Sequence, residues 1–152
     1  MQISLEPLAW VQNERSAIQD DHWSEVESRL VLDDCLPDEA FEEIESFSHV
    51  HVVFWFHKVP DEKIVRGSRH PRNQQHWPKV GILAQRGKNR PNRIGLCVAR
   101  VLRREGRTLV VAGLDAIDGT PILDIKPVMQ EFLPREEVSQ PAWSTELMKQ
   151  YW

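Results

Sequence analysis

The sequence feature that most limits the possible folds is the alternation across residues 49–57, which read HVHVVFWFH. Every even position of this segment is apolar, whereas its odd positions mix histidines with Val53 and Trp55. Successive side chains of a β-strand point to opposite faces, so this period of two predicts a strand with one face in a core. We expect the other face to lie in a polar or functional space.

The rest of the chain indicates further strands and few helices. Strands are predicted at residues 3–11, 28–33, 79–85, 94–104, 107–114 and 121–125. Helices are predicted only at residues 36–47, where Pro37 suits a first helical position, and at residues 141–152. Residues 59–78 lack periodicity and indicate a mobile functional loop. The pattern predicts an all-β fold, a six- to seven-stranded barrel with short peripheral helices, or an α+β fold dominated by one sheet.

Length and composition place the chain among globular proteins. Its 152 residues fit one domain, spanning residues 1–152, that can bury roughly 70% of the surface exposed on unfolding. No apolar run approaches the roughly 18 residues of a membrane span. Glu6 and the lack of a basic start argue against a secretory signal. Cys35 and Cys97 lie far apart, so we expect no disulfide framework or zinc knuckle, and a cytoplasmic location.

The charges are unevenly distributed along the chain. Residues 63–104, here called the basic band, contain twelve Lys or Arg residues and no Asp or Glu. The rest of the chain holds the other seven basic residues and all 23 acids. Such a band attracts phosphates and predicts an anionic ligand. The alternative is that acids from elsewhere in the fold pair with these cations.

Two clusters of polar residues carry the candidate chemistry. The basic loop at residues 86–95 has four cations within eight positions, interleaved with Gly, Pro and Asn. The acidic cluster at residues 113–127 places Asp115, Asp118, Asp124 and Lys126 around an Asp-Gly turn. These patterns are also compatible with a solvated basic turn and with a β-turn that contains a structural Asp124–Lys126 pair.

Linked blocks of residues give the sequence a specific resemblance. They are residues 47–57, Lys79-Val80-Gly81 with Arg86, Asn89-Arg90-Pro91-Asn92, Ile94-Gly95-Leu96, Gly113-Leu114-Asp115, Asp118-Gly119-Thr120-Pro121 and Asp124-Ile125-Lys126-Pro127. In order and spacing they resemble the TsaA-like family. The resemblance implies a single-sheeted β-barrel that binds S-adenosylmethionine, commonly as a homodimer. It also implies N6-methylation of threonylcarbamoyladenosine in transfer RNA.

The resemblance further implies which residues contact the cofactor. It assigns this role to His57, Arg86, Leu96, Asp118, Gly119, Thr120 and Pro121. A guanidinium such as that of Arg86 can pair with the carboxylate of S-adenosylmethionine. Asp21 and Trp23 do not align with the family blocks, and we add them as further candidate contacts. The chain departs from the usual family pattern at Gly87-Lys88, Arg93 and Val128.

Methyl transfer from a sulfonium requires positioning of two reactants and no covalent nucleophile. We expect a general base among His57, Asp115, Asp118 and Asp124 to take the proton of the acceptor nitrogen. The substrate is expected to be held by Arg90, Asn92, Arg93 and Lys126.

Other chemistries fit the sequence less well. The strand would separate His49 from His57 by roughly 26 Å, so these histidines cannot share a metal, and we expect no metal site. Cys97 lies between apolar neighbours and is predicted to be a buried thiol. The remaining alternative is a non-catalytic module that binds nucleic acid or senses S-adenosylmethionine through the basic band.

Overall fold

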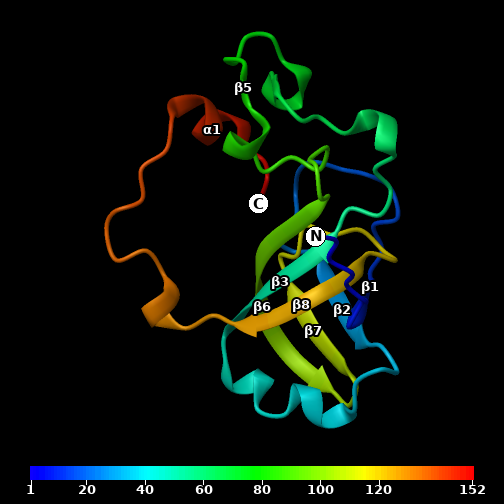
Figure 1. Cartoon of the computed structure of the whole chain (residues 1–152). Coiled ribbons are helices and arrows are strands. Elements are labelled where there is room, and N and C mark those ends of the chain that lie inside the picture. Colours follow the sequence, from blue (N-terminus) through cyan, green and yellow to red (C-terminus); the bar gives the residue numbers. More distant parts are fainter.

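Six antiparallel strands close into a barrel in the order β1-β2-β7-β6-β3-β8 (Figure 1). The computed structural model describes all residues, 1–152. The barrel strands are β1 (Ala9–Gln12), β2 (Glu27–Leu32), β3 (His49–Trp55), β6 (Ile94–Glu105), β7 (Thr108–Ala112) and β8 (Pro121–Pro127). Every other element is short. The prediction of an all-β barrel with short peripheral helices is therefore confirmed.

The interior of the barrel is filled by the apolar faces of its strands, as expected for a barrel of this size. In β3, Val50, Val52 and Phe54 are buried and alternate with partly exposed residues, as the sequence predicts. Gly95 of β6 lies opposite Phe54, and a Cβ atom at this position would lie 2.4 Å from two carbons of the Phe54 ring. The missing side chain of Gly95 therefore provides the space that the Phe54 ring occupies.

Strand β6 is the longest strand and connects two parts of the barrel. Its first half pairs with β3 and its second half with β7, and its register against β7 shifts between Val101 and Arg103. An irregularity of this kind bends a strand and increases its twist, which helps a single sheet to close on itself. Gly106, with φ of 59°, makes the tight turn from β6 to β7 that the sequence predicts.

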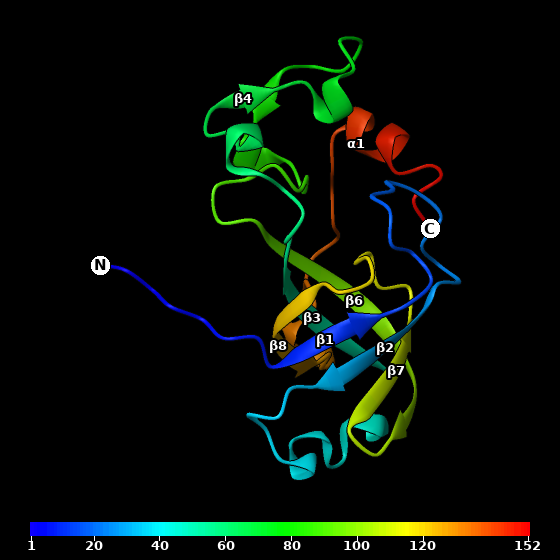
Figure 2. The same cartoon turned by 90° about the vertical axis from the view of Figure 1, so that its right-hand side faces the viewer.

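The chain between β3 and β6, residues 58–93, forms an excursion beyond one end of the barrel (Figure 2). It contains the two-stranded sheet of β4 (Ser68–Arg69) and β5 (Val80–Gly81), with 3-10 helices at Asp61–Lys63, Pro71–Asn73 and Ile82–Ala84. The strand predicted over residues 79–85 is wrong beyond Gly81. There the chain turns into a 3-10 helix and buries Ile82, which is only 3% exposed.

The helix predicted over residues 36–47 is also wrong. The segment forms two 3-10 helices, Asp38–Phe41 and Ile44–Ser46, separated by Glu43 in the left-handed region with φ of 63°. Phe41 belongs to the barrel core and Ile44 packs against it. The break between the two turns directs both apolar side chains into the open end of the barrel, which is more favourable here than a continuous helix.

The two ends of the chain also differ from the sequence prediction. The first strand begins only at Ala9 rather than at Ile3, and the residues before it are mostly exposed. The helix expected over residues 141–152 is limited to α1 (Ala142–Leu147). After β8 the chain forms a 3-10 helix at Gln130–Phe132 and then returns to the excursion, where α1 lies (Figures 1 and 2).

None of the helices combines the length and the apolar composition that crossing a membrane requires.

The close contact between Gly95 and Phe54 gives a stability prediction. Gly95→Ala should lower the free energy of unfolding by about 1–3 kcal/mol, because the added methyl group must displace the Phe54 ring. Gly67→Ala is the matched control, since a Cβ atom there meets nothing within 4 Å. The control should change stability by at most about 1 kcal/mol, in the stabilising direction. Urea unfolding of both variants measures the difference, and equal stabilities would contradict the packing described.

Candidate functional site

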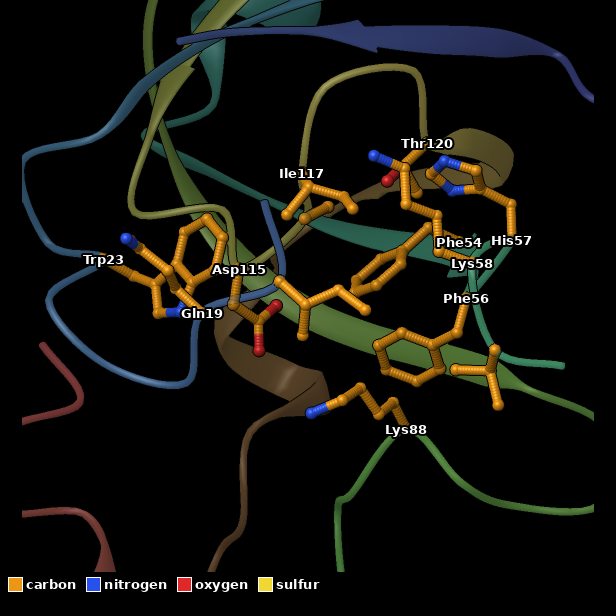
Figure 3. Close-up of a pocket in the computed structure, with 13 residues that line it drawn as sticks. Gln19, Trp23, Phe54, Phe56, His57, Lys58, Lys88, Asp115, Ile117 and Thr120 are labelled. Atoms are coloured by element: carbon orange, nitrogen blue, oxygen red, sulfur yellow. The ribbon is translucent and has the colours of Figure 1, made fainter. Parts of the chain in front are cut away.

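A pocket opens at the end of the barrel where β3 ends and β8 begins, close to the excursion (Figure 3). Its enclosed volume is about 60 Å³, and the pocket continues outward into open solvent. Its walls come from the loop after β1, the end of β3, the excursion and the segment before β8. The lining residues are Ile18, Gln19, Trp23, Phe54, Phe56, His57, Lys58, Val59, Lys88, Asp115, Ala116, Ile117 and Thr120.

Aromatic side chains form the apolar part of the pocket. The rings of Phe54 and Phe56 pack edge to face with their centroids 5.2 Å apart. Trp23 is buried on another side of the pocket, and the guanidinium of Arg15 lies 4.5 Å from the centre of its ring. Such walls suit the flat, apolar face of a ring system such as a nucleobase.

His57 lies two residues beyond β3, beside the turn that leads into β8. The pKa of His57 is lowered, chiefly because the ring is partly buried and also because Lys58 is close, while the Asp118 carboxylate opposes this shift. The imidazole is therefore neutral at pH 7. Gly119 has a φ of 75°, and a Cβ atom there would contact Nε2 of His57 at 4.0 Å. Glycine at this position thus permits the positive φ of the turn, whereas the distance to the ring would allow an ordinary van der Waals contact.

Asn13 holds the acidic turn against the barrel. Its side-chain amide donates hydrogen bonds to Oγ of Ser28 (2.8 Å) and to the carbonyl of Ala116 (2.9 Å). Its backbone N–H donates to Oδ1 of Asp118 at 3.1 Å, and the N–H of Gly119 donates to the carbonyl of Val11. These bonds fix the turn relative to β1, so the groups beside His57 are held by the barrel itself.

Asp115 is the acidic group that faces the pocket. The hydroxyl of Tyr151 donates a hydrogen bond to its Oδ2 atom. Its Oδ1 atom is buried and has no hydrogen-bond partner. The Cys97 thiol lies near it, and burial together with the charge of Asp115 raises the pKa of Cys97, so the thiol stays protonated. The prediction that Cys97 is a buried thiol is confirmed.

Ion pairs connect the loop after β1 to the excursion at the rim of the pocket. Lys88 pairs with Asp20 at 3.0 Å, and Arg72 binds both carboxylate oxygens of Asp21 at 2.6 and 3.0 Å. The Lys58 ammonium donates to the carbonyl of Ser16 at 2.6 Å. Asp21 is therefore turned toward Arg72, while Trp23 from the same loop lines the pocket.

The structure divides the residues that the sequence selects into two groups. Trp23, His57, Asp115 and Thr120 line the pocket, with Asp118 and Gly119 in the adjoining turn and Pro121 buried at the start of β8. Arg86 and Leu96 do not line the pocket: the Arg86 guanidinium donates to the Leu96 carbonyl, and the Leu96 side chain is exposed. The charge of Arg86 still acts on Cys97 and Tyr151, the neighbours of Asp115, and opposes the rise in pKa that burial causes in each. Asp124 and Lys126 form an ion pair of 2.8 Å beside this second group, because β8 and β6 flank β3.

The three remaining substrate candidates lie in the loop before β6. Arg93 pairs with Asp61 and stacks on Trp55, with its guanidinium 5.3 Å from the ring centre. Arg90 donates to the carbonyl of Gln85 at 2.9 Å, and Asn92 is exposed.

The basic band is only partly neutralised by the fold. Four of its twelve cations form ion pairs with carboxylates: Arg72, Lys88, Arg93 and Arg103. The other eight form none: Lys63, Arg66, Arg69, Lys79, Arg86, Arg90, Arg100 and Arg104. Carboxylates from elsewhere in the fold therefore neutralise a third of the cations in the band. The positive charge of the other cations remains available to an anion.

Sequence reasoning missed several residues of the site. Asn13 and Gln19 lie in a polar segment without a recognisable motif, and Lys58 looks like an ordinary surface residue. Tyr151 is 36 positions from its partner Asp115, and no local pattern connects the two. A sequence signal existed only for Lys88, which belongs to the basic loop.

The fold and site define a class: a small, closed antiparallel barrel with a mixed apolar and polar pocket at one end. The chain matches, over residues 9–132, the family described as the tRNA-methyltransferase O N-terminal domain, and it belongs to that family. The match confirms the family that the sequence blocks indicate.

Individual relatives agree with this assignment. The chain is 38% identical over 100 residues to a probable S-adenosyl-L-methionine-binding protein of Pyrococcus abyssi, covering 66% of this chain and 52% of that protein. It is 36% identical over 105 residues to the human tRNA (adenine(37)-N6)-methyltransferase, covering 69% of this chain and 23% of the human one. A crystal structure of TrmO from Pseudomonas aeruginosa superposes with a TM-score of 0.73 at 26% identity, covering 94% of this chain and 62% of that one. The chain thus spans from about a quarter to about three fifths of these proteins.

The environment of His57 gives a prediction about its titration. The pKa of His57 should lie below the ordinary value of about 6.5, because the ring is partly buried beside Lys58. Lys58→Gln should raise this pKa and Asp118→Asn should lower it further, since each variant removes a charge of opposite sign. NMR titration of the imidazole protons measures these shifts, with Lys79→Gln in the excursion as the control for loss of a lysine. A His57 pKa at or above the ordinary value would contradict the site described.

Proposed function

We propose that this chain is an S-adenosylmethionine-dependent methyltransferase that acts on an RNA substrate, of the class that methylates N6 of a modified adenosine in transfer RNA. The observation that carries the proposal is the pocket at the barrel end, where His57 and the residues around the Asp118 turn meet. These residues belong to the blocks that define the family. The names of the human and Pyrococcus relatives support both the reaction and the cofactor.

The pocket fits the chemical groups of S-adenosylmethionine. The aromatic walls at Phe54, Phe56 and Trp23 suit a nucleobase, and the buried Oδ1 of Asp115 lacks a donor that a ligand can supply. We place the cofactor contacts on Trp23, His57, Thr120 and the Asp118–Gly119 turn. Asp21, Arg86, Leu96 and Pro121 complete the proposed set, although none of these four is part of the pocket wall.

In the proposed reaction the bound cofactor supplies an electrophilic methyl group, and the protein positions the acceptor in line with it. We assign the removal of the acceptor proton to His57, with Asp115 and Asp124 as the other candidate bases. His57 has the strongest support, since its lowered pKa keeps it in the proton-accepting form at pH 7. Asp124 has weaker support, because it is paired with Lys126 away from the pocket.

The basic band supports an anionic substrate. Its eight cations without a carboxylate partner provide the charge that a phosphate backbone requires. Within it, Arg90, Asn92 and Arg93 lie in the loop that follows the excursion, and we assign substrate binding to these residues together with Lys126. This proposal extends to transfer RNA, which the names of the mammalian relatives specify for those proteins.

We further propose that residues 1–152 act as one domain, that the chain forms a homodimer and that it works in the cytoplasm. The exposed side chains of Leu96 and Val98 support the dimer, because they form an apolar stripe on the outer face of β6. Apolar surface of this kind is stabilised when a partner covers it.

The cofactor proposal is tested by calorimetric titration with S-adenosylmethionine. We expect micromolar binding by the wild-type protein. Asp118→Ala should weaken it about tenfold or more, since it releases the turn from Asn13. Arg86→Ala should weaken binding by a similar factor, because it removes the guanidinium that pairs with the carboxylate of S-adenosylmethionine. Arg100→Ala, an exposed arginine of β6 without an ion-pair partner, is the control and should bind normally. Absence of binding by the wild-type protein would contradict the proposal.

The substrate proposal is tested by the salt dependence of transfer RNA binding. The double variant Arg66→Gln with Lys79→Gln should bind transfer RNA more weakly. A plot of the logarithm of its binding constant against the logarithm of the salt concentration should be less steep by about two units, because two phosphate contacts are lost. Arg135→Gln with Lys149→Gln removes two exposed cations outside the basic band and is the control. A methylation assay of the same samples separates an enzyme from a binding module. Binding of both ligands without methyl transfer would favour the non-catalytic alternative.

A further inference from the structure

The C-terminal segment of the chain, residues 141–152, returns to the pocket from the far side of the molecule. Its last residues pair with the loop after β1 through two backbone hydrogen bonds of 2.9 Å, from the N–H of His22 to Gln150 and from the N–H of Trp23 to Tyr151. Its helix α1 contacts the excursion, because the indole of Trp77 donates to the Glu146 carboxylate at 3.0 Å. This segment lies outside residues 9–132, the part that matches the family.

Tyr151 brings the C-terminal segment into contact with the pocket through Asp115. The Tyr151 hydroxyl occupies one oxygen of this carboxylate, while the other is buried and unpaired. Burial and the charge of Asp115 raise the pKa of Tyr151, so its hydroxyl remains a donor at neutral pH. Tyr151 thus holds the Asp115 carboxylate through its Oδ2 atom. The other oxygen, Oδ1, is a buried acceptor without a hydrogen-bond partner.

A buried acceptor without a donor is costly, and the cost falls when a ligand brings the missing hydrogen. The surrounding aromatic walls restrict the ligand to one with an apolar or ring body. S-adenosylmethionine has such a body and carries two nitrogen donors, the amine of its adenine and its α-ammonium group. The positively charged side chains at the rim, Lys58 and Lys88, are each engaged by the loop after β1 and leave this acceptor free.

We propose that Asp115 accepts a hydrogen bond from an amino group of bound S-adenosylmethionine and that Tyr151 is the positioning residue that holds Asp115 for this contact. The inference rests on the proposed function, because it concerns the same cofactor. It adds a specific acceptor to the site, and it makes the end of the chain part of the cofactor pocket.

The test begins with calorimetric Kd values for S-adenosylmethionine. Asp115→Asn should bind about 10- to 100-fold more weakly, the range expected for loss of a hydrogen bond to a charged group. Tyr151→Phe should bind about threefold to tenfold more weakly. Ser144→Ala is the matched control, because it removes a hydroxyl of the same segment that bonds only to Pro141. Asp115→Asn keeps an acceptor for Tyr151, so it tests the contact even where Tyr151→Phe does not fold.

A double variant distinguishes positioning from a merely structural role. If Tyr151 acts through Asp115, Tyr151→Phe should have no further effect on the Kd in the Asp115→Asn background. Tyr151 is also the one tyrosine of the chain, so its ionisation can be followed by the absorbance of the phenolate. In the wild-type protein the pKa of Tyr151 should lie above the ordinary value for tyrosine. Asp115→Asn should lower the pKa of Tyr151, because it removes a negative charge next to the hydroxyl.

Repeating the titrations with methylthioadenosine, which lacks the amino-acid part, identifies the donor. If Asp115→Asn loses as much affinity for methylthioadenosine as it does for S-adenosylmethionine, the contact is with the adenine amine. If Asp115→Asn binds methylthioadenosine as well as the wild-type protein does, the contact is with the α-ammonium group. Wild-type affinity of Asp115→Asn for S-adenosylmethionine, or additive effects of the two substitutions, would overturn the inference while the proposed function stands. Failure of the wild-type protein to bind the cofactor would overturn both.

Discussion

The pairing of β8 with two strands at once is the constraint on which the rest of the structure depends. Its first residues pair with β1 and its remaining length pairs with β3, so the sheet closes and leaves no free edge. Closure brings the start of β8 beside the end of β3, and this places the Asp118–Gly119 turn against His57. The same geometry requires Gly95, because the ring of Phe54 fills the position of a side chain there and forms part of the pocket wall.

The loop after β1 and the excursion complete the pocket that the barrel begins, and the C-terminal segment contacts Asp115 of the pocket wall through Tyr151. The ion pairs Arg72–Asp21 and Lys88–Asp20 join the first two, and partly exposed pairs of this kind each contribute little to stability. Burial of Trp23 and its backbone pairing with Tyr151 contribute more, since they remove a large aromatic surface from water. The arrangement uses Arg72 and Lys88 of the basic band to build the rim and leaves eight cations of the band without a carboxylate partner.

The sequence predicts the barrel well because alternation is a local property, clearest in β3, and because the family blocks are local as well. Where distant packing decides, prediction fails. The segment at 36–47 has a good helical pattern, yet it breaks at Glu43 so that Phe41 and Ile44 both face the core. Asp115 and Asp124 look equivalent in the acidic cluster. A register shift opposite Val53 and Phe54 separates them, because it turns Ile122 and Ile125 inward and leaves Asp124 outside.

We propose that the barrel end, with the segments that cover it, is the binding site for S-adenosylmethionine. Titration of isotopically labelled protein with this cofactor, followed by backbone amide NMR shifts, tests the claim most directly. We expect the largest shifts on residues 18–23, 56–59 and 115–121, on Arg86 and Leu96, and on Tyr151 at the end of the chain. Shifts confined to the outer face of β6, or no shifts at saturating cofactor, would contradict this proposal.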